Sequence, residues 1–409
     1  MRICFASTLY PGLHRDWGGA EVACQRLHDL LRKEHHQVAV VTTRPDNGAV
    51  AGLEHYTVPT MVDYLGRRGA MALDTLVPFD PLVYKPALRL LDSIRPDVVH
   101  LHSFKELTFS FLWAARNRGL PILFSLYDLW ALCPQSNLVH YRGGTCSSYM
   151  GWECLRCAVP ERKPLVLLRR LFFKHFLRHI DRLIVLSETV KRQLTEFGLP
   201  EQKISILPLP LFKSGDRRPS PGNVDDHSIL FVGWMTRPKG LHVLIEAMPA
   251  VLARVPDAKV LVVETGANAE HKAEFQRRIA DLDLEGRFRF LGKRNSGEIK
   301  ALLAQTSVVA VPEQWGIAWP IFCTEAMAYG KPIAASRIGD IPWFIRDHET
   351  GLLFDARSPE QLADCLISFF EEPESALRMG RRAQDFILEV CNRERITARL
   401  LSFYEEVRS

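Results

Sequence analysis

Short apolar segments of strand length alternate with segments of helical periodicity along the chain. Arg2–Ser7 is followed by Ala20–Lys33, in which apolar residues recur at helical spacing, and then by Val38–Val41. Comparable apolar runs follow at Val98–Leu101, Ile122–Leu126 and Leu183–Leu186. Fully apolar runs of this length, separated by helices, are typical of a parallel sheet that is buried on both faces. The pattern therefore predicts an α/β fold.

The alternation stops in a proline-rich polar segment and then restarts. We expect a linker at 211–227, because prolines and a glycine interrupt any regular element there. Beyond it, strands are expected at Ile229–Val232, Lys259–Val263, Phe288–Leu291, Val308–Val311 and Pro332–Ala335, and helices at Leu241–Val255, Ser296–Gln305, Phe322–Tyr329 and Pro359–Phe370. Two facing Rossmann-like, doubly wound domains account for this repetition, the first spanning 1–210. In such domains, ligands bind beyond the carboxyl ends of the strands.

Length and composition agree with two globular domains. The 409 residues are 47% hydrophobic and 24% charged, and no uninterrupted apolar stretch approaches the roughly 18 residues of a membrane-spanning helix. The N-terminal apolar run is too short for a signal peptide, and nine mostly scattered cysteines are typical of a reducing compartment, so we expect a cytoplasmic protein. Residues 1–215 hold 27 Lys and Arg against 19 Asp and Glu, which favours an anionic partner for this half.

Two glycine-containing turns are candidate phosphate sites. Gly18 and Gly19 lie between the first strand and a helix, where backbone amides can approach an anion, although such glycines also serve turn geometry alone. In the second half, Gly233 ends a strand, and Arg237 and Lys239 precede the next helix. Cations beside a helix N-terminus are favourable when an anion lies between them, so we expect a diphosphate there. A solvated loop is the alternative.

Segment 312–335 carries a candidate ribose-binding carboxylate. Pro320 precedes a short helix, Glu325 lies about one turn into it, and Gly330 and Pro332 follow its end. A carboxylate at this depth can accept hydrogen bonds from both hydroxyls of a ribose, as acidic residues do in dinucleotide sites. A half-buried structural glutamate is the alternative.

Together these motifs resemble glycosyltransferase family 4, in the order in which that family has them. The matching segments are Gly18–Glu21, Asp97–His102, Leu186–Glu188, Phe231–Gly233, Lys239–Gly240, Glu325–Ala328 and Gly351–Phe354. The resemblance covers essentially the whole chain and implies the GT-B fold. It implies that a hexosyltransferase-like enzyme transfers a sugar from a nucleoside diphosphate sugar, with retention and without a required metal or other cofactor. The acceptor would be a saccharide, a lipid-linked molecule or a natural product, as in the biosynthesis of polysaccharides and glycoconjugates.

The family resemblance also implies how the chain is divided. The second domain, which binds the nucleotide sugar, would occupy 228–382, and the first domain would bind the acceptor. A last helix, at about Ala383–Val407 within 383–409, would cross back to the first domain.

Several residues of the donor site depart from the family pattern. The first of two glutamates usual in the family falls on Ile317, and the arginine that usually grips the diphosphate is Trp234. Losing that cation costs on the order of 1.5–3 kcal/mol of binding unless Arg237 replaces it. Either the site is reshaped, with Trp234, Trp319 and Trp343 as stacking surfaces, or the chain is a catalytically degenerate relative that binds a glycan or supports a partner enzyme. In the second case the tryptophans only pack.

For an active enzyme, the resemblance assigns roles in the donor site. Lys239, Arg237 and the backbone amides of Ile321 and Phe322 would hold the departing diphosphate, whose own oxygen takes the acceptor proton. Glu325 would anchor the ribose.

On the acceptor side, the family's His-Asp pair reads Tyr127–Asp128. Asp128 would hydrogen-bond the acceptor hydroxyl, and Tyr127 would fill the place of the histidine. For Asp128, a turn or helix cap is the alternative.

Four of the cysteines, Cys133, Cys146, Cys154 and Cys157, surround a loop that has no apolar core of its own. Four thiolates suit a tetrahedral structural zinc, which would order such a loop and shape the acceptor entrance. Free thiols or disulfides are the alternatives, and an iron–sulfur cluster fits less well.

Residues 162–182 are rich in both cations and apolar side chains. The segment contains seven Lys and Arg but one acidic residue, Asp181, and leucines and phenylalanines lie between the cations in the sequence. Such a helix could make peripheral contact with the anionic inner face of a membrane, where lipid-linked acceptors are found. A core helix with an exposed basic face is the alternative. No nucleic-acid partner is expected, since no reader motif is present.

Overall fold

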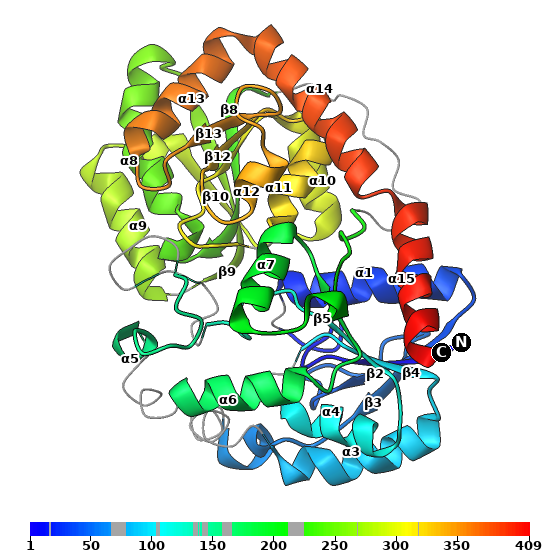
Figure 1. Cartoon of the computed structure of the whole chain (residues 1–409). Coiled ribbons are helices and arrows are strands. Elements are labelled where there is room, and N and C mark those ends of the chain that lie inside the picture. Colours follow the sequence, from blue (N-terminus) through cyan, green and yellow to red (C-terminus); the bar gives the residue numbers. More distant parts are fainter. Residues whose placement is uncertain are drawn as a thin grey trace. The chain divides into compact units, whose positions relative to one another are not determined.

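The computed structural model describes residues 1–15, 18–66, 79–103, 107–133, 138, 140, 146–157, 166–211, 225–267, 269–317 and 319–409. The chain forms two compact units (Figure 1). Unit 1 comprises Met1–Ser214 and Cys391–Ser409, and unit 2 comprises Gly215–Val390.

Unit 1 is built on a seven-stranded parallel sheet with the order β3-β2-β1-β4-β5-β6-β7. Its strands are β1 (Arg2–Ala6), β2 (Gln37–Thr42), β3 (Glu54–Thr57), β4 (Val98–Leu101), β5 (Ile122–Ser125), β6 (Arg182–Val185) and β7 (Ile204–Ile206). Every residue of β4 and β5 is buried, which confirms a sheet covered on both faces. The sequence did not reveal β3, because its four residues are polar or aromatic and none of them is buried.

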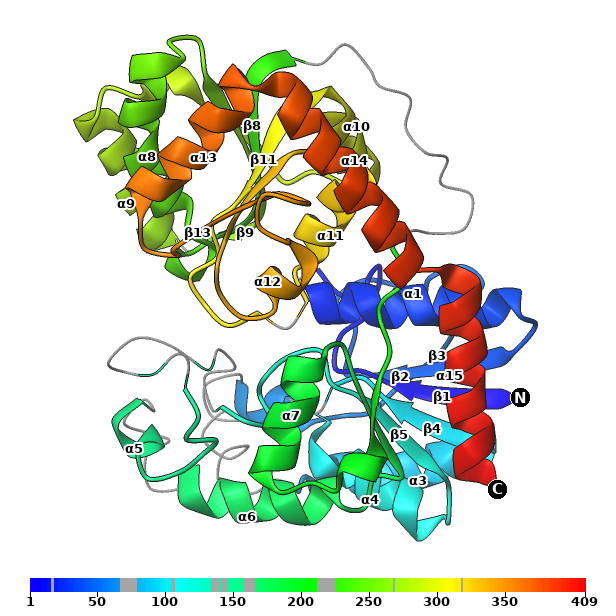
Figure 2. The ribbon, with the colours of Figure 1, turned by 45° about the horizontal axis from the view of Figure 1, so that its top comes forward.

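The helices of unit 1 are α1 (Gly19–Lys33), α3 (Pro81–Ile94), α4 (Thr108–Asn117), α5 (Cys154–Cys157), α6 (Val166–Leu177), α7 (Glu188–Phe197) and α15 (Arg393–Arg408). Helices α3 and α4 pack side by side (Figure 1). Helix α15 is separated in sequence from the rest of unit 1 by the whole of unit 2. It nevertheless lies in unit 1, beside the strands coloured blue and cyan (Figure 2). It is fixed there by Tyr404, a fully buried side chain whose hydroxyl hydrogen-bonds His100 Nδ1 at 2.6 Å.

Unit 2 has a six-stranded parallel sheet with the order β10-β9-β8-β11-β12-β13. Its strands are β8 (Asp225–Met235), β9 (Lys259–Ala267), β10 (Phe288–Gly292), β11 (Thr306–Val311), β12 (Ile333–Ser336) and β13 (Leu352–Phe354). Its helices are α8 (Leu241–Arg254), α9 (Ala269–Asp281), α10 (Ser296–Gln305), α11 (Ile321–Ala328), α12 (Ile341–Phe344), α13 (Pro359–Glu371) and α14 (Pro373–Val390). Helices α8 and α13 pack against each other, and their apolar faces join the strands in one core (Figure 1).

Both sheets have the doubly wound strand order, so the predicted fold class is confirmed. In each sheet the order reverses between two neighbouring strands, β1 and β4 in unit 1 and β8 and β11 in unit 2. The chain leaves these two strands toward opposite sides, which opens a crevice at their carboxyl ends. The loops after β1, β4, β8 and β11 are therefore where a ligand site is expected.

Two expected boundaries need correction. The segment 383–409 is not one helix: residues up to Val390 complete α14 in unit 2, and α15 starts a new helix in unit 1. The break falls at Asn392, whose side chain accepts a hydrogen bond from Arg395 N at 2.9 Å and so caps α15. The linker 211–227 is also too long, because β8 begins at Asp225. Residues 212–224 of that linker lie outside the described part of the chain.

In the described ranges, no helix combines the length and the apolar character needed to cross a membrane.

Candidate functional site

The crevice of unit 2 lies between the loops that follow β8 and β11. Gly233 belongs to the last part of β8, and a Cβ built on it would lie 3.5 Å from Lys239 Cδ, so the stem of the lysine passes over the glycine. After β11, the chain continues through Pro312 to Glu313. The topological reversal thus brings Lys239 and Glu313 together although 74 positions separate them.

Gly240 determines how closely these two loops approach. Its φ is +77°, and a Cβ at this position would lie only 1.6 Å from the carbonyl oxygen of Pro312. Only glycine combines this backbone conformation with such a close contact. Gln314 N also donates to Pro238 O at 2.8 Å, which ties the two loops together on the other side of the glycine.

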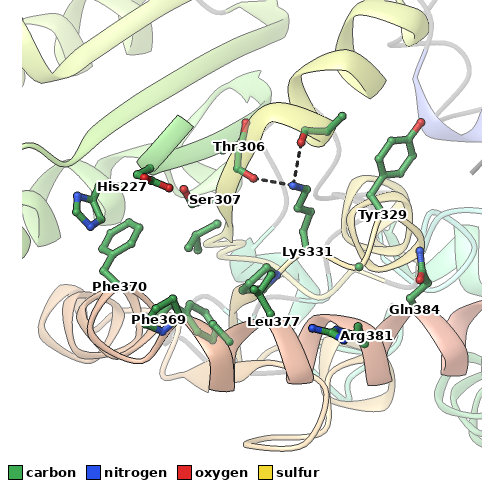
Figure 3. A pocket seen from close by; sticks show the side chains of 17 residues that line it. His227, Thr306, Ser307, Tyr329, Lys331, Phe369, Phe370, Leu377, Arg381 and Gln384 are labelled. Carbon is green, nitrogen blue, oxygen red and sulfur yellow. Dashed lines mark hydrogen bonds between the residues drawn. The ribbon is translucent and has the colours of Figure 1, made fainter. Parts of the chain in front are cut away.

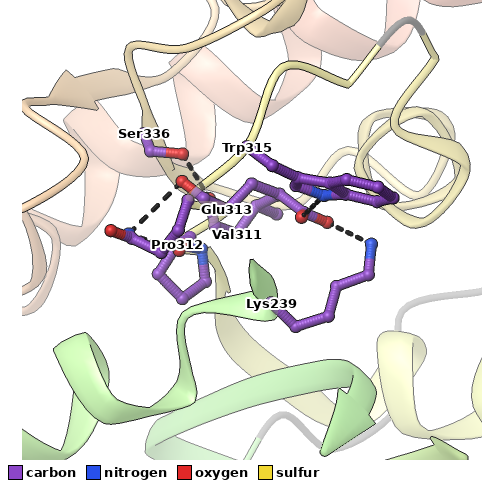
Figure 4. A network of polar contacts seen from close by, with 7 residues as sticks. Lys239, Val311, Pro312, Glu313, Trp315 and Ser336 are labelled. Carbon is purple, nitrogen blue, oxygen red and sulfur yellow. Dashed lines mark hydrogen bonds and ion pairs between the residues drawn. The ribbon is translucent and has the colours of Figure 1, made fainter. Parts of the chain in front are cut away.

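Lys239 and Glu313 form a buried ion pair that is extended by an indole (Figure 4). Lys239 Nζ donates to Glu313 Oε1 at 2.5 Å, and Trp315 Nε1 donates to Glu313 Oε2 at 2.6 Å. The Lys239 ammonium also lies 5.5 Å from the centre of the Trp315 ring. The carboxylate side chain is 8% exposed and the lysine side chain 21%, so the charge on the lysine is compensated in a site largely shielded from water. Glu313 was not predicted as a site residue.

The second predicted cation, Arg237, is also paired. Its guanidinium forms hydrogen bonds with both carboxylate oxygens of Glu274 on α9, and its side chain is 58% exposed. Glu264 of β9 is paired with Lys272 Nζ at 2.7 Å. Each of these carboxylates therefore neutralises a cation near the carboxyl edge of the sheet.

Helix α11 carries the remaining predicted donor-site residues. Thr324 N makes the first intrahelical bond, to Pro320 O, so the amides of Ile321 and Phe322 precede the hydrogen-bonded turns of the helix. Both residues are partly exposed. Glu325 lies one turn further along α11 and is half-buried, which fits both the predicted ribose contact and the alternative of a structural glutamate.

The three tryptophans differ in exposure. Trp319 is 5% exposed and packs edge-on against Phe344 at 4.7 Å, so it belongs to the packing of unit 2 and offers no stacking surface. Trp234 and Trp343 are 40% and 45% exposed. A ligand can stack only on these two.

In unit 1, Tyr127 and His102 follow neighbouring strands, β5 and β4. Tyr127 Oη and His102 Nδ1 are hydrogen-bonded at 2.9 Å, and the two rings are nearly parallel. Burial raises the pKa of the Tyr127 phenol and lowers the pKa of His102 well below its ordinary value, so both groups are neutral at pH 7. Among the described residues, His102 Nε2 has no hydrogen-bond partner.

His100 lies two residues before His102 on the same face, and the ring centres are 4.2 Å apart. Its Nε2 hydrogen-bonds Ser125 Oγ at 2.8 Å, and its Nδ1 hydrogen-bonds Tyr404 of α15. Burial lowers the pKa of His100 to about 3. The alternation of these histidines at a strand end was a signal in the sequence, but their partner on α15 was not.

Two other predicted residues are engaged within unit 1. The amide of Gly18 donates to Glu21 Oε2 at 2.8 Å, so a carboxylate already occupies the N-terminus of α1, where we expected a phosphate near Gly18 and Gly19. Asp128 Oδ1 accepts a hydrogen bond from Trp130 N at 3.0 Å, which is the turn-capping geometry considered as its alternative role.

The predicted zinc site is not supported. All four cysteines are described, and Cys133, Cys146 and Cys154 are buried thiols. No group of three or more His, Cys, Asp or Glu side chains in the described ranges could hold a metal ion.

Comparison with known families agrees with this architecture. Residues 17–211 match the model described as glycosyltransferase family 4, and residues 213–386 match the model described as glycosyl transferases group 1. The two matches meet near the junction of the two units.

Proteins of several bacteria are similar in sequence to this chain. The D-inositol 3-phosphate glycosyltransferase of Corynebacterium glutamicum is 34% identical over 158 residues, which are 38% of this chain and 38% of the relative. The D-rhamnosyltransferase WbpZ of Pseudomonas aeruginosa is 28% identical over 233 residues, 55% of this chain and 59% of that protein. The matched part thus spans well under two thirds of the length of these relatives.

Solved structures share the fold over the whole chain. HepE of Anabaena, solved with UDP and glucose, has a TM-score of 0.72 at 18% identity, with 99% of this chain and 100% of HepE covered. Sucrose-phosphate synthase of Thermosynechococcus elongatus has a TM-score of 0.76 at 19% identity, and the match covers 99% of this chain and 98% of the synthase. Family models of glycosyltransferases match both units, and the solved structures confirm the GT-B fold. The chain therefore belongs to the glycosyltransferases of the family 4 type.

Proposed function

We propose that this protein transfers a sugar from a nucleoside diphosphate sugar to an acceptor hydroxyl, with retention of configuration and without a catalytic metal. The observation that carries the proposal is the position of Lys239 at the topological reversal of unit 2, the place where open parallel sheets bind nucleotides. HepE, which shares the fold, was solved with UDP-glucose. A uridine diphosphate sugar is therefore the first donor to test.

In the donor site, Lys239 binds the diphosphate. An ammonium group has three donors, and Glu313 engages one of them, so the lysine can contact a phosphate oxygen while it stays paired. The amides of Ile321 and Phe322 add hydrogen-bond donors at the positive end of α11, and the carboxylate of Glu325 accepts hydrogen bonds from the ribose hydroxyls. Arg237 reaches the phosphates only by leaving Glu274, which at its exposed position costs little.

The transfer step needs no placed nucleophile. As the bond from the anomeric carbon to the diphosphate breaks, the lysine and the helix amides stabilise the charge that develops on the leaving oxygen. The acceptor oxygen forms its bond to the anomeric carbon on the face from which the diphosphate departs, and the departing oxygen takes the proton of the acceptor hydroxyl, so the configuration is retained. In unit 1, Asp128, which also caps the turn at Trp130, accepts a hydrogen bond from the acceptor hydroxyl.

We further propose that α6 brings the enzyme to a lipid-linked acceptor. Leu168, Leu171 and Phe172 are 49%, 66% and 39% exposed, and Arg170, Lys174 and Arg178 flank them. The exposed face of this helix is thus apolar with cations beside it, which favours a bilayer surface over the alternative of a purely basic face. Residues 162–165 of the predicted segment lie outside the described ranges.

Flotation with vesicles tests the membrane contact. Wild-type protein should bind vesicles that contain phosphatidylglycerol better than vesicles of phosphatidylcholine alone, and the double variant Leu171→Glu, Phe172→Glu should lose binding. The variant Leu82→Glu, at an exposed leucine of α3, is the control. Equal flotation of wild type and double variant would show that α6 is not the contact.

The transfer reaction is tested first without an acceptor. Incubation with a panel of nucleoside diphosphate sugars should release nucleoside diphosphate slowly, with water as the acceptor, and NMR of the freed sugar should show the anomer of the donor first. The opposite anomer would contradict retention. The absence of turnover with every donor, under conditions in which nucleotides bind, would favour the degenerate relative instead.

A further inference from the structure

A cavity lies at the edge of the unit 2 sheet opposite the proposed donor site. It is about 760 Å³ in volume, and it opens where β8, β11 and β12 begin. Ser307 and Lys331 belong to that edge, and Phe370 and Leu377 approach from α13 and α14 (Figure 3). A cavity of this size accommodates an organic ligand. Because it lies at the amino ends of the strands, it is separate from the proposed donor site.

The cavity is polarised along its length. Lys331 and Arg381 lie on one side of it, together with Gln384, and Phe369 and Phe370 lie on the other (Figure 3). Leu377 lies between the two groups. A ligand that fills the cavity therefore meets cations at one end and aromatic rings at the other.

The cations of the cavity are not neutralised by the protein. Lys331 Nζ donates to the carbonyl oxygens of Ala304 at 3.3 Å and Thr306 at 2.8 Å, which leaves one of its three donors. Neither Lys331 nor Arg381 is within ion-pairing distance of a carboxylate among the described residues. Burial lowers the pKa of Lys331 to about 8, as expected for a cation that lacks a counterion.

The aromatic end of the cavity also holds a histidine and a carboxylate. Phe369 is 2% exposed. His227 packs edge-on against Phe370, with the ring centres 5.2 Å apart, and is hydrogen-bonded to Asp257 at 2.7 Å. Asp226 is the acidic residue among those that line the cavity, and it is next to His227 in the chain. A carboxylate at this end disfavours a second anionic group on the ligand but does not oppose an anion at Lys331 and Arg381.

We propose that this cavity binds a small amphipathic organic anion, with its charged head between Lys331 and Arg381 and its apolar body against Phe369 and Phe370. The charged head forms charge-assisted hydrogen bonds, and the apolar body removes the exposed surface of Leu377 and Phe370 from water. The proposal does not rest on the transfer reaction, because binding itself is the observation that tests it.

Octanoate is the probe, with acetate and 1-octanol as its separated head and body. Calorimetric titration of the full chain should show octanoate binding at one site, with acetate and 1-octanol each at least about tenfold weaker because each lacks half of the interactions. If 1-octanol binds as tightly as octanoate, the cations do not contribute to binding of the carboxylate, and the proposal is wrong.

Two neighbouring arginines of α14 provide matched variants. Arg381→Glu reverses a charge in the cavity and should weaken octanoate binding at least about tenfold. Arg382→Glu makes the same change at an exposed position that does not line the cavity, and it should leave the affinity within about twofold. Lys331→Met should weaken binding as Arg381→Glu does. Equal effects of Arg381→Glu and Arg382→Glu, or no effect of either cavity variant, would overturn the proposal.

Discussion

Lys239 Nζ lies 2.5 Å from Glu313 Oε1, so the cation expected to hold a diphosphate is already paired with a buried carboxylate. Trp315 Nε1 holds the other oxygen of the same carboxylate. Nucleotide affinity must therefore balance the attraction of phosphate to the lysine against its repulsion by Glu313. The pair fixes the lysine in place and at the same time reduces the net charge of the site.

Glu313→Gln should bind nucleoside diphosphates more tightly. The amide keeps one acceptor oxygen but removes a negative charge close to the phosphates, so we expect a gain of about three- to tenfold in affinity. The protein should also lose about 1–3 kcal/mol of stability, because one oxygen cannot serve both Lys239 and Trp315 equally well. Calorimetric titration with UDP measures the first effect and urea unfolding the second. Glu285→Gln, at an exposed glutamate of unit 2, should change neither quantity.

Gly240→Ala should destabilise unit 2 by more than about 2 kcal/mol, because the methyl group meets the Pro312 carbonyl and φ is positive. Nucleotide binding should fall as well, since the loop of Lys239 moves away from Glu313. Gly286→Ala is the control, because open space surrounds Gly286 and its φ is not positive. If urea unfolding gave the same midpoint for both variants, the close approach of the two loops would be refuted.

Acid should destabilise unit 1 through His100. Its pKa is 6.5 when exposed and about 3 in the folded unit, so the unfolded chain takes up a proton first and stability falls as the pH drops below 6.5. Between pH 7.5 and pH 5 the loss from this residue is about 2 kcal/mol. His100→Gln should lose less stability over that interval, and His175→Gln, at an exposed histidine of α6, should behave as the wild type. Parallel curves for all three proteins would contradict this assignment.

Alkaline pH should stabilise unit 2 through Lys331. Its pKa is about 8 in the folded unit and 10.5 when exposed, so between these values the unfolded chain binds more protons and stability rises with pH. Lys331→Met should remove this rise. Unfolding midpoints at pH 8 and pH 10, compared for wild type and variant, measure it. A rise that persists in the variant would assign the effect to other groups.

The sequence predicted the sheets better than the contacts between distant residues. Apolar runs such as Val98–Leu101 predicted strands correctly because burial on both faces leaves no polar position. The break at Asn392 was missed because the apolar periodicity continues on both sides of it. The asparagine itself was a local signal, since asparagine is a favoured N-cap residue, but it was not used.

Within the candidate site, residue type was predictable but partnership was not. Lys239 was identified by its place after a strand and before a helix, and Glu313 follows the neighbouring strand in the same way. Only the strand order shows that these two loops share one crevice. Tyr404 carried no signal at all, because its contact with His100 depends on the return of α15 to unit 1.

The most direct test of the account is the binding of nucleoside diphosphates to wild-type protein and to Lys239→Met. The wild type should bind at least one member of a panel that includes UDP and GDP, with a gain in stability of about 2.7 kcal/mol at a hundredfold excess over the dissociation constant. Lys239→Met should abolish this gain, while Lys259→Met, at the amino end of β9 and so at the opposite edge of the sheet, should keep it. Unchanged binding by Lys239→Met would contradict the account, because the phosphates would then lie in another loop.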